Sequence, residues 1–335
     1  MAGSGTAHLR GDEALLSVEQ LTVEYVTKAG RVQAVSGVSF DVRRGETLGI
    51  VGESGCGKST TGRAVLRLDR GTEGNIRFGE EQIDQADSKR MRELRRDMQL
   101  IFQDPIASLN PRRSVRDIVS EGLTVAGASE AERSEASETM LTKVGLDPQR
   151  FAELLPGQLS GGQAQRVAIA RALAVQPRLL ICDEPVSALD VSVQAQILNL
   201  IEDLKREYEL TVVFIAHDLG VVRSVSDTVM VMYLGKVCEV GDSVKVYEAP
   251  AHPYTRALLD SAPQTDPNQP FAGPPLEGDV PSPLDPPTGC RFRTRCPKAQ
   301  DLCAREEPHV RQIAPGQHVA CHFPLKDVVE GGLVS

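Results

Sequence analysis

Cysteine is scarce over most of this chain and frequent near its end. Cys56, Cys182 and Cys238 are the three cysteines before residue 290, and four more follow. The first residues, MAGSGTAHLRGDEALL, lack a cationic stretch followed by an apolar run, so we expect no secretory signal, and Ala2 excludes the myristoylation pattern. Without such a signal, the odd total of seven cysteines argues against a disulfide framework.

Long apolar runs and an excess of basic residues are also lacking. The string TVVFIA (211–216) is among the longest apolar runs, far short of the roughly 18 residues that a membrane-spanning helix needs. The chain has 37 Lys and Arg against 46 Asp and Glu, so its formal net charge is -9. Nucleic-acid-binding proteins usually carry a basic surface. We therefore expect a soluble, cytoplasmic protein with no nucleic-acid partner.

The apolar pattern over most of the chain is typical of an α/β domain. TLGIV (47–51), RLLICD (178–183) and TVVFIA are patterns of buried strands, and residues 191–208 carry apolar side chains at helical spacing. The order strand, helix, strand predicts parallel strands joined by right-handed crossovers. Polar helical patterns at 91–96, 114–127 and 129–146 suggest a helical subdomain inserted at about residues 104–172.

Composition divides the chain into four regions. Residues 1–14 are small and polar, and we expect them to be disordered. Residues 15–262 carry the α/β pattern. Residues 263–287 hold nine of the 21 prolines and predict a stiff, extended linker. Residues 288–335 form a small C-terminal appendage with four cysteines.

The stretch GESGCGKST (52–60) fits the pattern G-x-x-x-x-G-K-S/T, with a strand pattern before it and a helix pattern after it. Its glycines let backbone N–H groups point at phosphate oxygens, and the helix adds its positive N-terminal end. Lys58 is expected to reach the β- and γ-phosphates and Ser59 to bind Mg²⁺, whereas Cys56 is read as a small side chain that the loop tolerates. The residues expected to bind the nucleotide are Gly52, Glu53, Ser54, Gly55, Cys56, Gly57, Lys58, Ser59 and Thr60.

Two adjacent carboxylates, Asp183 and Glu184, end the apolar strand RLLICD. Desolvating charges is costly, so this position needs a partner such as Mg²⁺. Asp183 is expected to hold the metal, and Glu184 to act as general base on the attacking water. His217 follows the next strand and is placed to contact the γ-phosphate. Gln103 follows MQLIF and is placed to reach the metal and the water.

The segment LSGGQAQR (159–166) starts a helix with small residues at its N-terminus. Ser160, Gly161 and Gly162, followed by Gln163, are expected to leave the first N–H groups exposed, which makes a second anion-binding site. One chain then has two phosphate-binding helix ends and one lysine-bearing loop. A head-to-tail dimer, in which this end closes on the partner's γ-phosphate, accounts for both.

These motifs, together with FQDP around Gln103 and SALD around Asp190, resemble those of the ATP-binding-cassette (ABC) ATPases over residues 15–262. The resemblance implies the ABC type of P-loop NTPase fold: a mixed sheet core, an antiparallel β edge and an inserted helical subdomain. It also implies that Tyr25 stacks on adenine, although alone Tyr25 reads as an ordinary strand aromatic. It places Asp190 at the dimer seam. No catalytic position departs from the pattern, so we expect an active ATPase.

A narrower resemblance is carried by IFQDPIASLNPR, CDEPVSALDVSVQAQI, HPYTRALL and GDVPSPLDPPTGCRFRTRCP. These segments are similar to the ATPase subunits of bacterial oligopeptide and dipeptide importers, and closer to the F-type than to the D-type subunit. This implies ATP-driven peptide import at the cytoplasmic face of the inner (plasma) membrane. The implied partners are a D-type ATPase subunit in a heterodimer, two membrane permease subunits and an external peptide-binding protein.

Other functions fit less well. Nickel importers share much of the pattern, so a nickel or other small-solute importer remains an alternative substrate class. Soluble ABC ATPases of repair carry long insertions and those of translation carry two cassettes, and neither feature is present here. A metal-binding regulator without catalysis is opposed by the intact Lys58, Glu184 and His217.

The four late cysteines, Cys290, Cys296, Cys303 and Cys321, have the spacing C-x₅-C-x₆-C-x₁₇-C. They have four possible roles: independent buried thiols, disulfides, a structural zinc site or a [4Fe–4S] cluster. Zinc sites usually include a short C-x₂₋₄-C pair, which is lacking, whereas a four-iron cluster takes four thiolates but usually with tighter spacing. The importer resemblance favours [4Fe–4S] over zinc.

Basic residues are interspersed with these cysteines. Arg291, Arg293, Arg295 and Lys298 either offset the charge of a thiolate-bound metal or form a solvated face. Because the appendage follows a proline-rich linker, we expect it to lie away from every catalytic residue and to take no part in hydrolysis.

Overall fold

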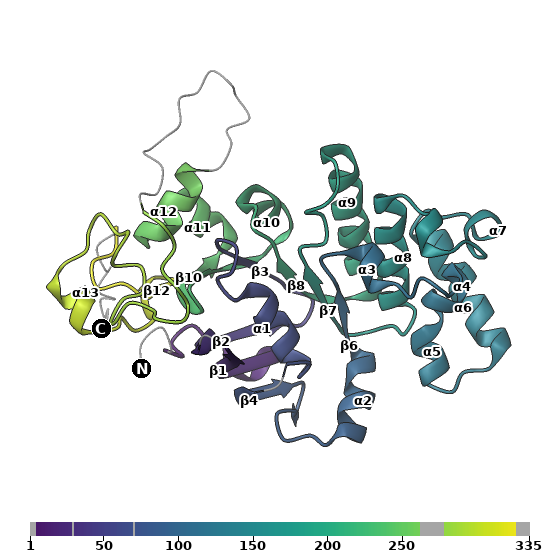
Figure 1. The fold of residues 1–335 in the computed structure, drawn as a ribbon, viewed down its shortest axis with the longest axis horizontal. Coiled ribbons are helices and arrows are strands. Elements are labelled where there is room, and N and C mark those ends of the chain that lie inside the picture. Colours follow the sequence, from purple (N-terminus) through teal and green to yellow (C-terminus); the bar gives the residue numbers. More distant parts are fainter. Residues whose placement is uncertain (1–4, 29, 70, 262–277, 326–335) are drawn as a thin grey trace, which may run out of the picture. The chain divides into compact units, whose positions relative to one another are not determined.

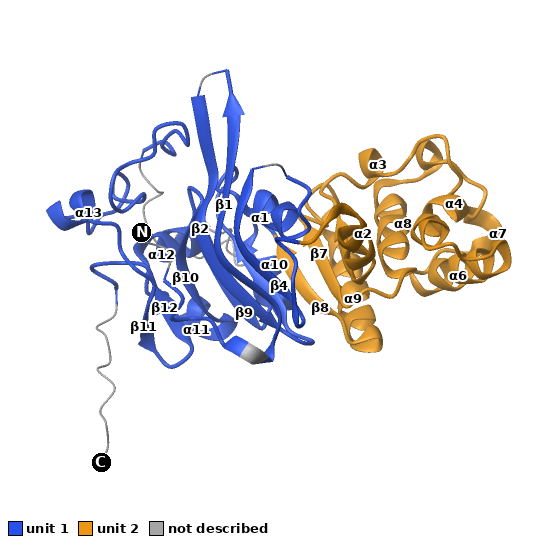
Figure 2. Cartoon of the chain, turned by 90° about the horizontal axis from the view of Figure 1, so that it is seen from below, with its two compact units in different colours: residues 1–85, 216–335 blue, residues 86–215 orange. Residues whose placement is uncertain are grey.

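The computed structural model of the chain describes residues 5–28, 30–69, 71–261 and 278–325 (Figure 1). These residues form two compact units (Figure 2). The first unit contains residues 1–85 and 216–335, and the second unit contains residues 86–215. The predicted ABC-type domain, residues 15–262, is therefore divided between both units, and the C-terminal appendage belongs to the first.

A four-stranded antiparallel sheet of the first unit has the order β2-β1-β4-β5. Its strands are β1 (Ala14–Thr27), β2 (Gly30–Arg43), β4 (Thr72–Phe78) and β5 (Glu81–Gln82). Strand β1 pairs along its length with β2 and also with β4. This is the antiparallel β component expected of the fold.

A second sheet of the first unit includes strands of the appendage, and β12 pairs there with β10. Its order within the unit is β11-β12-β10-β9-β3. The strands are β3 (Thr47–Val51), β9 (Thr228–Tyr233), β10 (Lys236–Asp242), β11 (Arg311–Ala314) and β12 (Gln317–Val319). Strands β3 and β9 are parallel, whereas β9 with β10, β10 with β12, and β11 with β12 are antiparallel. The sheet is therefore mixed, as predicted.

The helices of the first unit begin with α1 (Lys58–Val65), which starts directly after the glycine-rich loop. The others are α10 (Leu219–Val225), α11 (Ser243–Glu248), α12 (Pro253–Asp260) and α13 (Asp301–Arg305). Helix α12 starts with Pro253 at its first position, where the missing N–H is tolerated. His252 caps this helix, because its Nδ1 accepts from the N–H of Tyr254 at 3.0 Å.

The second unit contains a parallel sheet of β6 (Met98–Ile101), β7 (Leu179–Asp183) and β8 (Thr211–Ile215). Every residue of β7 and β8 is buried, as the apolar patterns predict. Helix α9 (Val191–Tyr208) connects β7 to β8 and buries Ile197, Ile201 and Leu204. The predicted strand–helix–strand crossover is confirmed over these residues.

The other helices of the second unit lie before and within the predicted subdomain. They are α2 (Ser88–Asp97), α3 (Pro105–Ser108), α4 (Val115–Val119), α5 (Glu121–Val125), α6 (Glu130–Lys143), α7 (Pro148–Phe151), the 3₁₀ helix η2 (Pro156–Gln158) and α8 (Gly161–Leu173). Ser129 and Glu132 form a capping box that starts α6. The helices from Pro105 to Leu173 match the predicted subdomain at about 104–172, but the compact unit also includes the three strands.

The N-terminal segment differs from the predicted disorder of residues 1–14. Its described part includes a 3₁₀ helix, η1 (Gly11–Glu13). His8 is buried, with its Nε2 2.6 Å from the carbonyl oxygen of Ser39. Arg10 forms ion pairs with Asp41 at 2.9 Å and Glu46 at 2.7 Å. Long-range partners, which composition does not reveal, therefore order residues 5–14.

The predicted linker lies mostly outside the described residues, and its described part, 278–287, contains no helix or strand. The appendage that follows is joined to the core by Glu239, a carboxylate that is fully buried in β10. Glu239 accepts from the N–H groups of Ala251 and His252, each at 2.9 Å, and from Nε2 of Gln317 at 2.7 Å. One side chain thus connects β10, the start of α12 and β12.

Candidate functional site

The glycine-rich loop lies between β3 and α1, as predicted. Gly52 has φ 152° and Gly57 has φ 102°, and a Cβ at either position would lie 2.2 Å from a backbone oxygen, that of Met232 or Ala34 respectively. Both contacts are far too short, so these two positions require glycine. The neighbouring backbone can then close tightly around the loop.

Lys58 is buried at the start of α1 and points back into the loop. Its Nζ donates to the carbonyl oxygens of Gly52 at 2.8 Å and Glu53 at 3.1 Å. The ammonium group is therefore held inside the curve of the loop. Cys56 is buried too, and burial raises the pKa of its thiol, which agrees with a small neutral side chain rather than a reactive one.

The second unit brings Gln103 and Glu184 together. Nε2 of Gln103, just beyond β6, donates to Oε2 of Glu184, just beyond β7, at 3.0 Å. The two residues come together because β6 and β7 are neighbouring parallel strands that end at the same edge of the sheet. Asp183 is the last residue of β7 and is buried, with 5% of its surface exposed.

Glu184 has an unusual backbone conformation. Its φ is 47°, in the left-handed region that side chains other than glycine rarely adopt. The surrounding fold maintains this conformation, since the N–H of Glu184 donates to the carbonyl of Ile215 at 2.9 Å and Oγ of Ser187 donates to the carbonyl of Glu184 at 3.1 Å. Backbone strain of this kind often occurs at functional sites.

The predicted second anion site lies at the start of α8. Ser160 caps this helix by accepting from the N–H of Gln163, and Oε1 of Gln163 accepts from the N–H of Ser160 in return. The N–H groups of Ser160 and Gln163, two of those expected to be bare, are thus already satisfied by the chain. Gly162 has a further reason to be glycine, because a Cβ there would lie 2.8 Å from Cγ1 of Val193 in α9.

Each of the remaining predicted residues is on or beside a different helix or strand. Asp190 is exposed and caps α9 by accepting from the N–H of Val193 at 3.0 Å; its hydrogen bond from Ser192 lowers the pKa of its carboxyl. His217 is exposed and comes directly after β8 in the chain. The hydroxyl of Tyr25, in β1, accepts from Arg63 of α1 at 3.3 Å.

All four late cysteines line one small pocket, which His252, Phe292 and His322 also border. Burial, and secondarily the nearby thiols, raise the pKa of Cys290 to about 11 and that of Cys321 to about 12. Burial also raises the pKa of Cys296. In the part of the chain that the structure describes, no three His, Cys, Asp or Glu side chains form a group that could hold a metal ion. The described geometry therefore supports neither the zinc reading nor the [4Fe–4S] reading.

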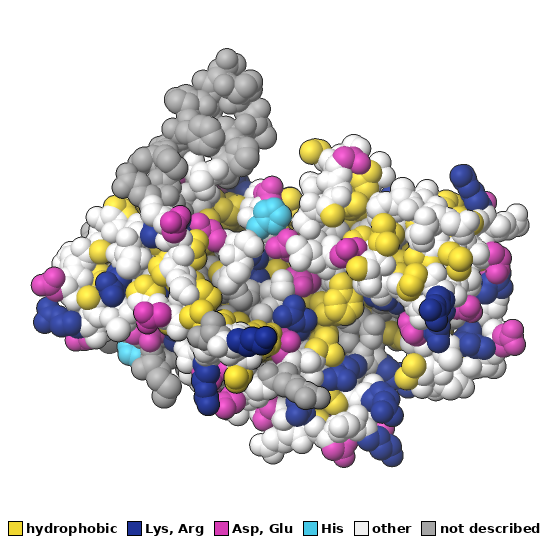
Figure 3. Space-filling view, in the orientation of Figure 1, with side chains coloured by type: hydrophobic (Ala, Val, Ile, Leu, Met, Phe, Trp, Pro, Cys, Tyr) yellow, Lys and Arg dark blue, Asp and Glu magenta, His cyan; other side chains and the backbone are white. Residues whose placement is uncertain are grey.

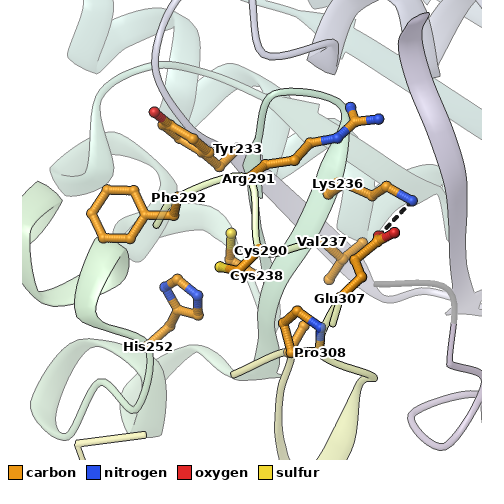
Figure 4. A pocket seen from close by; sticks show the side chains of 11 residues that line it. Tyr233, Lys236, Val237, Cys238, His252, Cys290, Arg291, Phe292, Glu307 and Pro308 are labelled. Atoms are coloured by element: carbon orange, nitrogen blue, oxygen red, sulfur yellow. Dashed lines mark ion pairs between the residues drawn. The ribbon is translucent and has the colours of Figure 1, made fainter. Parts of the chain in front are cut away.

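The appendage contacts the glycine-rich loop, a contact that the proline-rich linker before it does not suggest. Arg295 forms a two-pronged ion pair with Glu53, with Nη1 2.7 Å from Oε2 and Nη2 3.1 Å from Oε1. The appendage also borders a pocket with β9 and β10 (Figure 4), where Cys290 lies beside Cys238 and Lys236 pairs with Glu307 at 2.8 Å. The physical reason is that β12 and the aromatic side chain of Phe292 complete the core of the first unit.

Arg295 and Tyr254 are thus loop contacts that sequence reasoning missed. The hydroxyl of Tyr254 accepts from the N–H of Glu53 at 2.9 Å. The sequence indicates for Arg295 only a charge that balances a metal site or lies in a solvated face. Arg295 is 242 positions from Glu53 in the sequence. No local pattern connects residues so far apart.

The surface shows no broad region of one charge on the face drawn in Figure 3, where acidic and basic side chains are interspersed. No helix among the described residues has the length and apolar character that crossing a membrane requires.

Known proteins match the chain along most of its length. The ABC transporter family matches residues 35–187, and the family described as oligopeptide/dipeptide transporter, C-terminal region, matches residues 238–303. The oligopeptide transport ATP-binding protein AppF of Bacillus subtilis is 50% identical over 300 residues, covering 88% of this chain and 91% of its own. The oligopeptide transport ATP-binding protein OppF of Haemophilus influenzae is 46% identical, covering 92% of this chain and 97% of its own.

A solved structure supports the fold. It is the dimeric post-hydrolysis state of the ATP-binding cassette MJ0796 bound to ADP and phosphate, with a TM-score of 0.62 and 31% identity, covering 68% of this chain and 98% of that one. These likenesses identify the family, in agreement with the glycine-rich loop, the hydrogen bond between Gln103 and Glu184, and helix α8 capped by Ser160. The chain belongs to the ABC transporter ATPases, in the branch of oligopeptide and dipeptide transport ATP-binding proteins.

Proposed function

We propose that this chain hydrolyses ATP to ADP and phosphate and thereby powers the import of short peptides through a membrane transporter. The hydrogen bond between Gln103 and the strained Glu184 carries the catalytic part of this proposal. The peptide substrate rests on the relatives, which are named for oligopeptide and di/tripeptide transport. Those names favour peptides over nickel.

In this proposal the glycine-rich loop binds the phosphates of ATP. Its backbone N–H groups and Lys58 contact the β- and γ-phosphates, and Tyr25 stacks on adenine. Ser59, Gln103 and Asp183 are the proposed ligands of Mg²⁺, which would neutralise charge on the phosphates. Ser160, Gly161, Gly162 and Gln163 contact the γ-phosphate held by a partner ATPase subunit, and Asp190 lies at the seam between the two.

Hydrolysis then needs a base and an oriented water. Glu184 accepts a proton from the water as its oxygen attacks the γ-phosphorus and the bond to the ADP oxygen breaks. Gln103 holds the carboxylate of Glu184 by donating a hydrogen bond to its Oε2. His217 contacts the γ-phosphate and senses its loss.

Nucleotide binding and turnover by purified protein test this function. The wild type is expected to bind and hydrolyse ATP in the presence of Mg²⁺, and Lys58→Ala to lose binding or turnover. A Lys58→Ala variant with unchanged nucleotide affinity and rate would refute the assignment of the loop.

The proposal includes partners. A second, D-type ATPase subunit, two membrane permease subunits and an external peptide-binding protein would complete the transporter, and the chain would associate peripherally with the cytoplasmic face of the inner membrane. Affinity purification of the tagged chain from membranes should recover two permeases and a second ATPase subunit. Recovery of the chain alone from the soluble fraction would argue against this assembly.

We also propose that the pocket lined by Cys290, Cys296, Cys303 and Cys321 takes a [4Fe–4S] cluster. A four-iron cluster binds each thiolate at a different iron, so four cysteines around one pocket suit it better than they suit a single ion. The raised pKa values of Cys290 and Cys321 mean that binding must displace their protons. Such a cluster would hold the appendage together.

Anaerobic purification tests the cluster. The wild type is expected to absorb near 400 nm and to contain about four irons per chain. This absorbance should disappear when Cys303 is replaced by Ser. A colourless, iron-free protein from the same preparation would overturn this part of the proposal and leave the ATPase function unaffected.

A further inference from the structure

The second residue of the glycine-rich loop, Glu53, is fixed at every polar group. Its N–H donates to the hydroxyl of Tyr254 at 2.9 Å, and its carbonyl accepts from Nζ of Lys58 at 3.1 Å. Its carboxylate accepts both prongs of the Arg295 guanidinium, at 2.7 and 3.1 Å. Two of these three partners come from beyond residue 250, on the C-terminal side of the chain.

Arg295 is itself held rigidly. Its side chain is only 5% exposed, and its guanidinium lies 5.9 Å from the ring centroid of Tyr233. The ring of Tyr233 lies 4.7 Å from that of Tyr254 and 5.2 Å from that of Phe292. Because Phe292 and Arg295 belong to the same segment of the appendage, the aromatic cluster fixes the guanidinium against the loop.

The same segment reaches the loop by a second route. Arg291 donates to the carbonyl of Leu234, in the turn between β9 and β10, and to Oγ of Ser36 at 3.0 Å. Within that turn, the N–H of Gly235 donates to the carbonyl of Cys56, inside the loop, at 2.8 Å. The appendage therefore supports the loop both at Glu53 and, through the turn, at Cys56.

We propose that Arg291 and Arg295 of the appendage position the glycine-rich loop for ATP, with Arg295 as the main positioning residue. Arg295 would act through Glu53 and not by touching the nucleotide. This inference rests on the proposed role of the loop in ATP binding. It assigns the appendage a part in nucleotide binding.

Charge explains why this contact matters. A free Glu53 carboxylate would stand one residue from Gly52 and near the triphosphate, where two negative groups repel each other. The paired Arg295 neutralises that carboxylate, and its fork fixes the direction in which the carboxylate points. Removing Arg295 should therefore weaken ATP binding more than it slows the chemical step, so KM should rise while kcat changes little.

Four variants of the full chain test the proposal through the dissociation constant for ATP, KM and kcat. Arg295→Ala should raise the dissociation constant and KM by about tenfold, the size expected for one charge-assisted contact. Arg295→Lys should recover part of the loss, because it restores the charge but not the fork. Arg295→Ala combined with Glu53→Gln should recover more, because the unpaired negative charge is gone. Arg293→Ala is the matched control, since Arg293 bonds within the appendage, to the carbonyl of Thr288 at 2.9 Å.

The outcomes separate this inference from the proposed function. If wild-type protein binds ATP and Lys58→Ala does not, yet Arg295→Ala binds ATP like wild type, the inference is overturned and the function stands. If wild type does not bind ATP, the proposed function itself fails. If Arg295→Ala fails to fold, its thermal midpoint will show this, and the variants Arg295→Lys and Glu53→Gln then test the inference. Equal ATP affinity of these two variants and wild type would also overturn the inference.

Discussion

Nε2 of Gln103 lies 3.0 Å from Oε2 of Glu184, although 81 positions separate the two residues in the chain. Each residue comes just after a strand of the parallel sheet in the second unit. Glu184 also has a φ of 47°, a backbone conformation that residues other than glycine rarely adopt. This pair is the structural basis for assigning the hydrolytic step.

Replacing Glu184 with Gln should slow ATP hydrolysis strongly while leaving ATP binding intact, because the amide cannot accept the proton of the attacking water. ATP-bound dimers should then accumulate, which gel filtration with ATP and Mg²⁺ would detect. A loss of about 100-fold or more in kcat is the scale expected for a general base. A Glu184→Gln variant that turns over ATP at the wild-type rate would remove Glu184 from this role.

Replacing Gly162 with Ala should destabilise the second unit. The added Cβ would approach Cγ1 of Val193 to 2.8 Å, so α8 and α9 must separate or Val193 must move. We expect a loss of about 1–3 kcal/mol in unfolding free energy, as in other overpacked sites. Denaturant unfolding measures it.

Gly161→Ala is the matched control for this substitution. Its Cβ would meet Cδ2 of Leu189 at 3.4 Å, an ordinary contact. Stability should stay the same or rise by up to about 1 kcal/mol, because alanine favours helix. Equal stability of the two variants would contradict the packing role of Gly162.

Part of this architecture was readable from the sequence because it is local. The strand patterns, the crossover helix over residues 191–208 and the phosphate-binding loop each depend on residues close together in the chain. The sequence places Gln103 only near the metal and the water, whereas its hydrogen bond to Glu184 depends on the parallel pairing of β6 with β7. Gly162 was read only as an uncovered helix end, whereas its contact with Val193 depends on the packing of two helices.

Other features could not be predicted because distant partners create them. His8 and Arg10 are ordered by Ser39, Asp41 and Glu46, and no pattern in the first residues signals this. The ion pair between Arg295 and Glu53 joins the two separate sequence segments of the first unit, residues 1–85 and 216–335. A proline-rich linker suggested separation, but the length of a linker does not determine where the segment after it packs.

The buried His8 predicts a pH dependence of stability. Burial lowers the pKa of His8 below its ordinary 6.5, so the unfolded chain takes up a proton first as the pH falls. His8 therefore adds stability above pH 6.5 that is lost as the pH falls below this value, by at most about 1.4 kcal/mol per pH unit. Asp41, Arg10 and His318 are the charged or titratable groups near it.

Thermal unfolding between pH 7.5 and 5, with His8→Gln beside wild type, checks this prediction. The variant should lose less stability over that interval than wild type does. The substitution His309→Gln, at an exposed position, is the control and should follow wild type. Parallel curves for His8→Gln and wild type would show that His8 does not contribute.

Uptake of a labelled dipeptide or tripeptide by living cells tests the central claim most directly. The gene is deleted and replaced by either the wild-type chain or Glu184→Gln, at matched protein levels. We predict that wild type restores peptide uptake and that Glu184→Gln does not, while uptake of an unrelated solute is equal in both. Peptide uptake at the wild-type rate in the deleted strain, or in the strain with Glu184→Gln, would contradict the account.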